Sequence, residues 1–131
     1  MDLDLLEPGQ TLCGIEIVLT AELRAAYLDA VEDNEGLYPE QGVVPPMAIA
    51  ALVMSEAMRA VELPPGAIHT GQELTFAQAV DVGSTLLCSA RVASNSLRRG
   101  TRFLALDLKG SERGESVIEG RTTLVIAEET Q

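Results

Sequence analysis

The sequence predicts a single α+β domain in which an antiparallel sheet wraps around one long apolar helix. Three observations lead to this expectation. Residues 43–54 form the most apolar run of the chain, and the residues after 70 form four successive strand-like segments joined by short loops. The length of 131 residues, with 47% apolar side chains, suits one domain (1–131) with an aliphatic core.

The first part of the chain predicts an arm, a strand and a helix. Residues 1–13 are expected to form a loosely held arm, and residues 15–19 a short strand. Thr20 is a good helix N-cap. After it, apolar side chains recur at the spacing i, i+3, i+4, i+7 and i+8: Leu23, Ala26, Tyr27, Ala30 and Val31. This spacing predicts an amphipathic helix that packs by one face.

A second, longer helix is expected to form the centre of the domain. Residues 33–42 are polar and contain Gly and Pro, which favours a loop. Pro45 and Pro46 suit a first helical turn, and residues 64–66 (Pro-Pro-Gly) end the helix. A helix over residues 47–63 is about 26 Å long. Because residues 47–54 include no polar side chain, this helix must be covered on nearly every side.

The remaining residues predict strands at 70–77, 86–93, 101–109 and 117–127. Their short connections, 94–100 and 110–114 among them, indicate antiparallel pairing, because parallel strands need long crossovers. The arrangement that covers a long apolar helix with such a sheet is the hot-dog fold. A single copy leaves one flank of the helix and one sheet edge open, so we expect a dimer.

The charge distribution argues against nucleic acid as a partner. The net charge is −11, and residues 1–62 hold twelve Asp and Glu against two Arg. This half repels a polyanion. Residues 63–131 are nearly balanced, with eight acidic and seven basic residues. There Arg98, Arg99 and Arg102 either present themselves to a phosphate or form a solvated hairpin tip.

Metal, disulfide and membrane roles have little support in the sequence. Cys13 and Cys88 lack metal-site or CxxC spacing, which favours two small buried side chains over a disulfide. With one histidine in the chain, we expect neither a metal nor another cofactor. The apolar run of residues 43–54 is shorter than the roughly 20 residues that span a bilayer. No signal peptide is recognisable, so we expect a cytoplasmic protein that does not bind membranes.

Several stretches, in order and spacing, resemble the MaoC-like hydratases and dehydratases. More narrowly, they resemble the fatty-acid-synthase-type N-terminal dehydratase domain, which is often non-catalytic. The stretches are residues 27–33 (YLDAVED), 36–38, 42–47 (GVVPPM), 68–76 (IHTGQELTF) and 80–86 (VDVGSTL). The resemblance covers residues 15–127, nearly the whole chain, and it implies a single hot-dog domain.

The resemblance implies the addition or removal of water across the C2–C3 bond of a fatty acyl thioester. Active members carry an Asp and, five residues later, a His that acts as the base. Here Asp33 matches the Asp, but Tyr38 stands at the His position, and a phenol is a poor base at neutral pH. The Asn and Pro usual between them are Glu35 and Gly36, and Pro46, which has no N–H, aligns with a small Gly.

The catalytic pair expected from this match is Asp33 and Tyr38. Backbone N–H groups of Val43 and Val44 are expected to reach the thioester carbonyl from the start of the buried helix. Asp33 has the alternative of simply ending the first helix. Glu35 replaces the base only if it is buried, and otherwise it is an exposed loop acid.

Two further positions are expected to contact substrate. Met47, with Met54 and Met58 on the same helix, either lines an acyl tunnel or is adaptable core. His69, the one histidine, either makes a structural hydrogen bond or contacts the ligand.

Three functions remain open at this point. The first is a subunit of an enoyl-thioester hydratase or 3-hydroxyacyl-thioester dehydratase for acyl-CoA or acyl-carrier protein. It would work as a homodimer, or as a heterodimer with another hot-dog subunit. The second is a non-catalytic acyl-thioester-binding or partner subunit. The third is a hot-dog thioesterase, for which Glu56 is the helix carboxylate available before the final turn.

Overall fold

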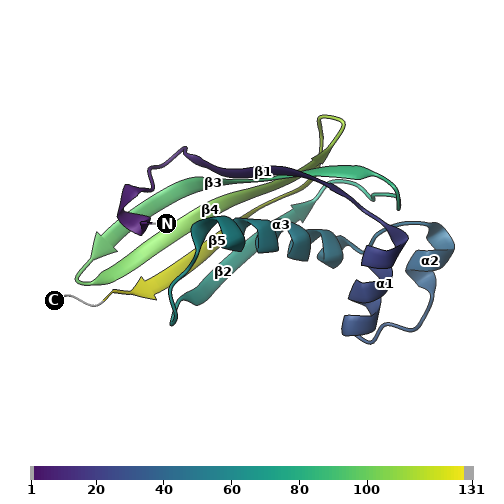
Figure 1. Cartoon of the computed structure of the whole chain (residues 1–131), viewed down its shortest axis with the longest axis horizontal. Helices are drawn as coiled ribbons and strands as arrows, with labels where there is room; N and C mark the ends of the chain where they lie inside the picture. The colour runs from purple at the N-terminus through teal and green to yellow at the C-terminus, as the bar shows by residue number, and fades with distance from the viewer. Residues whose placement is uncertain (1, 129–131) are drawn as a thin grey trace.

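The structure, a computed structural model, describes residues 2–128 and is drawn in Figure 1. Its helices and strands, in chain order, are η1 (Leu3–Leu5), β1 (Thr11–Val18), α1 (Ala21–Ala30), α2 (Leu37–Gln41), α3 (Pro46–Val61), β2 (Ile68–Phe76), β3 (Thr85–Arg98), β4 (Thr101–Glu112) and β5 (Glu115–Ala127). Every helix in this part of the chain falls short of the length and hydropathy that a membrane span requires.

The five strands form one antiparallel sheet in the order β1-β3-β4-β5-β2. The central helix α3 lies across one face of this sheet, here called the inner face (Figure 1). It packs on β1, β3 and β4. The short helices α1 and α2 lie at one end of α3, and η1 and the end of β5 lie at the other (Figure 1). The predicted α+β class with an antiparallel sheet and a central helix is confirmed.

The core forms between α3 and alternate residues of the strands. Ala50, Val53, Ala57 and Val61, spaced by three or four, are buried on the helix. They face the sheet residues Leu86, Leu104, Leu106, Ile118 and Ile126, all at most 2% exposed. Burial of each such side chain stabilises the fold by about 1.5–3 kcal/mol. Gly110 on β4 allows the Ile118 side chain of β5 to pack directly against the β4 backbone, because a Cβ at position 110 would lie 2.8 Å from Ile118 Cγ2.

The sheet covers α3 on one side only, which differs from the expectation of nearly complete cover. Ala51, Ser55 and Arg59 are exposed on the opposite side, and Met47 is 53% exposed at the start of the helix. The difference arises because five strands in one layer reach a single face of a helix. One flank of α3 therefore stays open in the single chain, as predicted.

The N-terminal arm is held to the sheet, so the expectation of a loose arm over residues 1–13 is wrong for residues 2–13. Leu3 and Leu6 are buried, and the Asn95 side chain donates hydrogen bonds to their carbonyl oxygens at 2.8 and 2.9 Å. β1 begins at Thr11 rather than at residue 15. Residue 1 lies outside the described residues. The arm packs because its two leucines cover the end of the inner face.

A buried arginine fastens this end of the molecule. Arg102 is 3% exposed and donates to Asp4, Glu128 and the side-chain oxygen of Asn95. We call these four residues the Arg102 clamp. The hydrogen bond to Glu128 is the largest cause of the raised pKa of Arg102. Burial lowers the pKa, and the hydrogen bond to Asp4 raises it again. Arg102 is therefore not available to a phosphate, whereas its two neighbours at the β3–β4 turn remain exposed.

Two segments expected as loops are partly regular. β3 and β4 extend through most of the 94–100 and 110–114 connections, which leaves tight turns such as Arg99-Gly100. The loop over residues 33–42 contains α2, bounded by Gly36 and Gly42 in left-handed conformation, with φ of 77° and 68°. Glycine adopts these angles without steric cost, which permits a one-turn helix in a polar loop.

Candidate functional site

Asp33 follows α1 at the end of the molecule where α3 begins. Its N–H donates to the carbonyl of Leu28 at 2.9 Å, which fastens the residue to the last turn of α1. Its Oδ1 accepts a hydrogen bond from the Glu35 N–H at 3.1 Å, an Asx turn. The side chain is half-buried and Glu35 is exposed. One carboxylate oxygen of Asp33 therefore shapes the loop, and Oδ2 accepts no hydrogen bond from residues 2–128.

Tyr38 lies in α2, and its backbone is tied down more firmly than its side chain. Its carbonyl accepts from the Val43 N–H at 3.3 Å and from the Arg24 guanidinium at 3.4 Å. Arg24, on α1, also donates to the carbonyl of Val43 at 3.4 Å. Within the described residues, the Tyr38 hydroxyl has no hydrogen-bond partner. Arg24 thus joins α1 to both ends of the segment from Tyr38 to Val43.

The backbone just before α3 is already hydrogen-bonded. The Val44 N–H donates to the carbonyl of Val80 at 2.9 Å, and Val43, whose N–H donates to Tyr38, forms a bridge with Asp81. A role of Val43 and Val44 as thioester donors, which stays a prediction, requires these bonds to break.

The first open donor of α3 is the N–H of Met47. Pro45 and Pro46 have no N–H to donate. The N–H groups of Ala48 and Ile49 bond the carbonyl of Pro45 at 3.0 and 3.4 Å. Met47 lies between the two prolines and Ala48. Its N–H has no acceptor among residues 2–128, and it lies at the positive end of the helix dipole.

The two flanks of α3 have different chemistry. Residues advance by about 100° around a helix, so Met47, Met54 and Met58 share one flank and Glu56 lies on the other. Glu56 is close enough to Cys13 on β1 and Cys88 on β3 to raise the pKa of both thiols. The methionine flank is therefore turned the other way, toward β5 and β2.

The cysteine flank is packed, and both of its thiols have a raised pKa. Burial, and secondarily Glu56 and Cys13, raise the pKa of Cys88 to about 12. Both cysteines are free. The Glu56 side chain is 14% exposed and pairs with Arg59 at 3.0 Å. No group of three or more His, Cys, Asp or Glu side chains across residues 2–128 is arranged to hold a metal ion.

His69 lies on β2, and its ring Nε2 is 2.5 Å from the hydroxyl of Thr122, which is fully buried on β5. Residues 80–82, just after β2, bond to residues 42–44, just before α3. The end of β2 at Phe76 therefore lies beside the start of α3. His69, seven residues earlier, lies about 23 Å back along the strand. Within one chain, His69 is not brought together with Asp33 and Tyr38.

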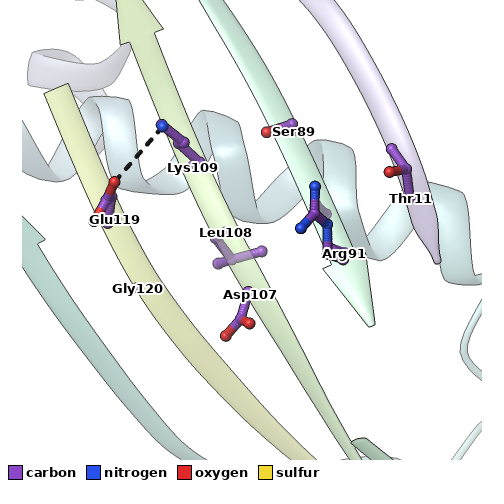
Figure 2. Close-up of a pocket in the computed structure, with 9 residues that line it drawn as sticks. Thr11, Ser89, Arg91, Asp107, Leu108, Lys109, Glu119 and Gly120 are labelled. Carbon is purple, nitrogen blue, oxygen red and sulfur yellow. Dashed lines mark ion pairs between the residues drawn. The ribbon is translucent and has the colours of Figure 1, made fainter. Parts of the chain in front are cut away.

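Two hollows lie on the sheet, and neither is lined by the expected site residues. Figure 2 shows the first, of about 460 Å³, with Arg91, Asp107 and Lys109 on its floor and α3 behind the strands. Its charges are largely paired, as Lys109 with Glu119 at 3.7 Å and Arg121 with Asp107 at 2.8 Å. The second, about 770 Å³, lies between the 81–84 turn and the β4–β5 turn.

Two polar residues of these arrangements were not singled out from the sequence. In the sequence, Arg24 is a charged residue outside the apolar face of the first helix. The pattern does not reveal that it donates to the carbonyl oxygens of Tyr38 and Val43. Thr122 is expected on the same strand face as Leu124 and Ile126, which is its position in the structure, but the pattern does not reveal its bond to His69.

Comparisons with known proteins agree on the fold. Among solved structures, the chain is similar to an (R)-hydratase from A. caviae involved in PHA biosynthesis, with a TM-score of 0.76, 23% identity and cover of 92% of this chain and 96% of that one. It is similar to a MaoC-like dehydratase from Rhodospirillum rubrum, with a TM-score of 0.76, 16% identity and cover of 100% and 99%.

A third likeness is to the HadBC (3R-hydroxyacyl-ACP dehydratase) complex from Mycobacterium tuberculosis, with a TM-score of 0.72, 18% identity and cover of 91% and 96%. No curated protein matches the sequence. The sequence model of the FAS1-like dehydratase domain region matches residues 19–119. With that match over most of its length and the single hot-dog fold that these structures share, the chain belongs to the FAS1-like dehydratase domain region family, as its MaoC-like motifs predicted.

Proposed function

We propose that this chain is a subunit of an enoyl-thioester hydratase or 3-hydroxyacyl-thioester dehydratase. It acts on an acyl-CoA or an acyl-carrier-protein thioester as part of a dimer. The observation that supports the proposal is that Asp33, Tyr38 and the open Met47 N–H all belong to the segment that leads from α1 into α3, in a chain of the dehydratase-region family.

The proposed chemistry divides the work between a donor and a base. The Met47 N–H, at the positive end of α3, polarises the thioester carbonyl and stabilises the enolate oxygen that develops there. A water oxygen bonds to C3 while the Asp33 carboxylate takes its proton, the C2=C3 electrons move toward the thioester oxygen, and C2 then takes that proton back from Asp33. Asp33 holds that water or its proton through the free Oδ2. Tyr38 offers its unpaired hydroxyl to the same substrate atoms.

The acyl chain is proposed to lie along the methionine flank of α3. Met54 and Met58 are half-buried, and the inner side of β2 adds Leu74 and Phe76. Methionine adapts to flexible apolar ligands, which suits an acyl tail.

The partner in the dimer is another hot-dog chain, joined at the β2 edge. β2 ends the sheet, and most of its residues are exposed on both faces. An exposed sheet edge is a template for pairing with another strand. The HadBC relative is a complex by name, which supports a partner chain without choosing between a like and an unlike one. A cytoplasmic location stays a prediction.

The test is hydration of crotonyl-CoA by the purified chain. Asp33→Asn is expected to lower kcat by about 100-fold. The matched control is Glu35→Gln, which removes an exposed acid of the same loop and is expected to leave kcat within twofold. An equal loss in both variants, or no loss in Asp33→Asn, contradicts the assignment of Asp33.

The products separate the competing functions. Hydration leaves the thioester intact as 3-hydroxybutyryl-CoA, whereas a thioesterase releases free CoA. Release of CoA that is abolished by Glu56→Gln would replace the proposal with the thioesterase. Binding of crotonyl-CoA without turnover would favour the non-catalytic partner subunit, and activity should then appear on addition of a hot-dog chain with an intact Asp and His pair.

A further inference from the structure

The face of the sheet turned away from α3, here called the outer face, carries its side chains in rows. Leu104, Leu106 and Leu108 of β4 are buried toward α3, so the residues between them point outward. Figure 2 looks onto this face, with α3 behind the strands. The strand register aligns the outward residues across β2, β5, β4 and β3, because residues opposite each other in neighbouring strands share a face.

Two of these rows are charged, and in each the sign of the charge alternates. The first row, taken from β2 to β3, is Glu73, Arg121, Asp107 and Arg91. The second row is Thr75, Glu119, Lys109 and Ser89. Three acidic and three basic side chains therefore cancel on this face, in a chain whose net charge is −11. A second copy of the acidic chain meets less repulsion here than a uniformly acidic surface would give.

The first row leaves the charges at its two ends without a partner. The two middle residues are paired, since Arg121 donates to Asp107 at 2.8 Å. Arg91 and Glu73 are both exposed, and neither forms an ion pair with any residue in the described range 2–128. The row thus ends in an unpaired cation on β3 and an unpaired anion on β2.

A two-fold axis that runs along the strands, between β4 and β5, makes this row self-complementary. Such an axis lays the outer face of a second copy on the first and reverses the order of each row. Arg91 then faces the partner's Glu73, and Asp107 faces the partner's Arg121. Both end charges therefore gain the opposite charge that their own chain does not supply.

The same axis suits the second charged row and two uncharged rows. Lys109 faces the partner's Glu119. The uncharged rows are Gly71, Thr123, Ala105 and Ser94, and then Ile68, Val125, Phe103 and Ser96. The first has small side chains, which favours the spacing of about 10 Å between packed sheets. In the second, Phe103, which is 45% exposed, faces the partner's Val125. Four successive rows are thus compatible with one axis.

An axis in the other direction, along the rows, fits less well. If it passes through the first row, Arg121 faces the partner's Arg121, and like charges destabilise the pair. If it passes between the two charged rows, Arg91 and Glu73 face the partner's Ser89 and Thr75. The end charges then stay unpaired. The pattern of charge therefore favours the axis along the strands.

We propose that the outer face binds a second copy of this chain, back to back, about a two-fold axis between β4 and β5. The contact lies on the face opposite α3 and apart from the β2 edge, so it does not depend on the proposed function. Four strands, over the seven residues from Phe103 to Lys109, span roughly 19 Å by 23 Å. The pair then buries about 900 Å², a size typical of weak association.

The experiment measures mass against concentration by analytical ultracentrifugation, with two variants of opposite sign. Arg121→Glu and Asp107→Lys each place like charges across the axis, so each alone should lower the association constant by about 10-fold or more. An equimolar mixture should regain the wild-type constant, because the new acid at position 121 faces the new base at position 107. The control Arg59→Glu makes the same change of charge on α3 and should associate as the wild type does.

The mixture separates a contact between chains from damage within one chain. A mixture that keeps the mass of its components, while the wild type associates, overturns the proposed pairing. A wild-type chain of constant mass from micromolar to near-millimolar concentration also overturns it, and leaves the face to solvent or to an unlike protein. Hydration of crotonyl-CoA is assayed separately, so the proposed function stands or fails on its own.

A second pair of variants tests the apolar row without changing charge. Phe103→Ser should weaken association by about 10-fold, because each copy loses apolar surface that the contact buries. Leu97→Ser is the matched control. Leu97 is 50% exposed but lies opposite the buried Arg102, on the inner side of the same hairpin. Circular dichroism verifies that both variants are folded. An equal loss in the two variants, or an association constant for Phe103→Ser within twofold of the wild type, overturns the placement of this row.

Discussion

The two ends of α3 are built in opposite ways. At its C-terminal end, the Arg102 clamp joins the arm, two strands and the segment after β5, and the charged groups are paired around a buried arginine. At its N-terminal end, α2 has no buried residue, the Tyr38 hydroxyl has no partner within residues 2–128, and the Met47 N–H is open. Stability is thus concentrated at one end of the domain, and unsatisfied polar groups at the other.

Removal of Arg102 should have the largest effect on this contrast. Arg102→Met is expected to lower the free energy of unfolding by about 3 kcal/mol, because it leaves partners of a buried ion pair without their cation. Asp4, with 67% of its side chain exposed, regains water and limits the loss. Urea denaturation measures the change, and Arg98→Met, at an exposed position of the same hairpin, is the control. A loss no larger than that of the control would mean that the clamp does not stabilise this end.

A change in pH should act on the middle of the helix, between the two ends. The raised pKa of Cys88 means that its thiol stays protonated in the fold after an unfolded chain would lose the proton. Its contribution is complete below pH 9 and is lost as the pH rises toward 12. Relative to Cys88→Ala, the wild-type chain should lose about 1 kcal/mol of stability between pH 8 and pH 10. Parallel denaturation curves at the two pH values test this, and an unchanged difference would contradict it.

The smallest effect on stability is expected at the open end. Arg24→Gln removes two long hydrogen bonds to carbonyl oxygens and should cost about 0.5 kcal/mol. Because Arg24 positions the Tyr38 segment, the same change should lower kcat/KM for crotonyl-CoA several-fold. The control is Arg59→Gln, whose side chain is 71% exposed on α3. A stability loss as large as that of Arg102→Met would remove the contrast between the ends.

The local pattern of apolar residues was sufficient to predict those helices and strands that bury one face. The apolar run after Pro46 predicted α3, and the strand pattern over residues 101–109 predicted β4, because burial on one face leaves a period in the sequence. The polar loop over residues 33–42 was also predicted in large part, since its Gly and Pro residues are contiguous in the sequence. The composition of the same loop concealed α2, whose five residues are too few to show a helical period.

Contacts between distant residues could not be predicted in this way. The Arg102 clamp joins positions 98 and 26 residues apart, so a basic residue in a hairpin beside Arg98 and Arg99 gave no sign of its burial. The bonds that occupy Val43 and Val44 depend on where residues 80–82 return to the helix. The distance between His69 and Asp33 depends in turn on the direction of β2 relative to α3. Each of these requires the tertiary fold, and no local pattern encodes it.

The Arg102 clamp also has a practical consequence for fusions. It holds Asp4 and Glu128 against one guanidinium, so the two ends of the described chain leave the domain within a few side chains of each other. Two positions this close, Asp4 and Glu128, can be joined by a short linker, the geometry that tolerates circular permutation and insertion into a host protein. A segment fused next to Asp4 or next to Glu128 leaves the domain at the end of α3 opposite α2. The same clamp sets a limit, since a graft that pulls the first few residues outward would draw Asp4 away from its arginine.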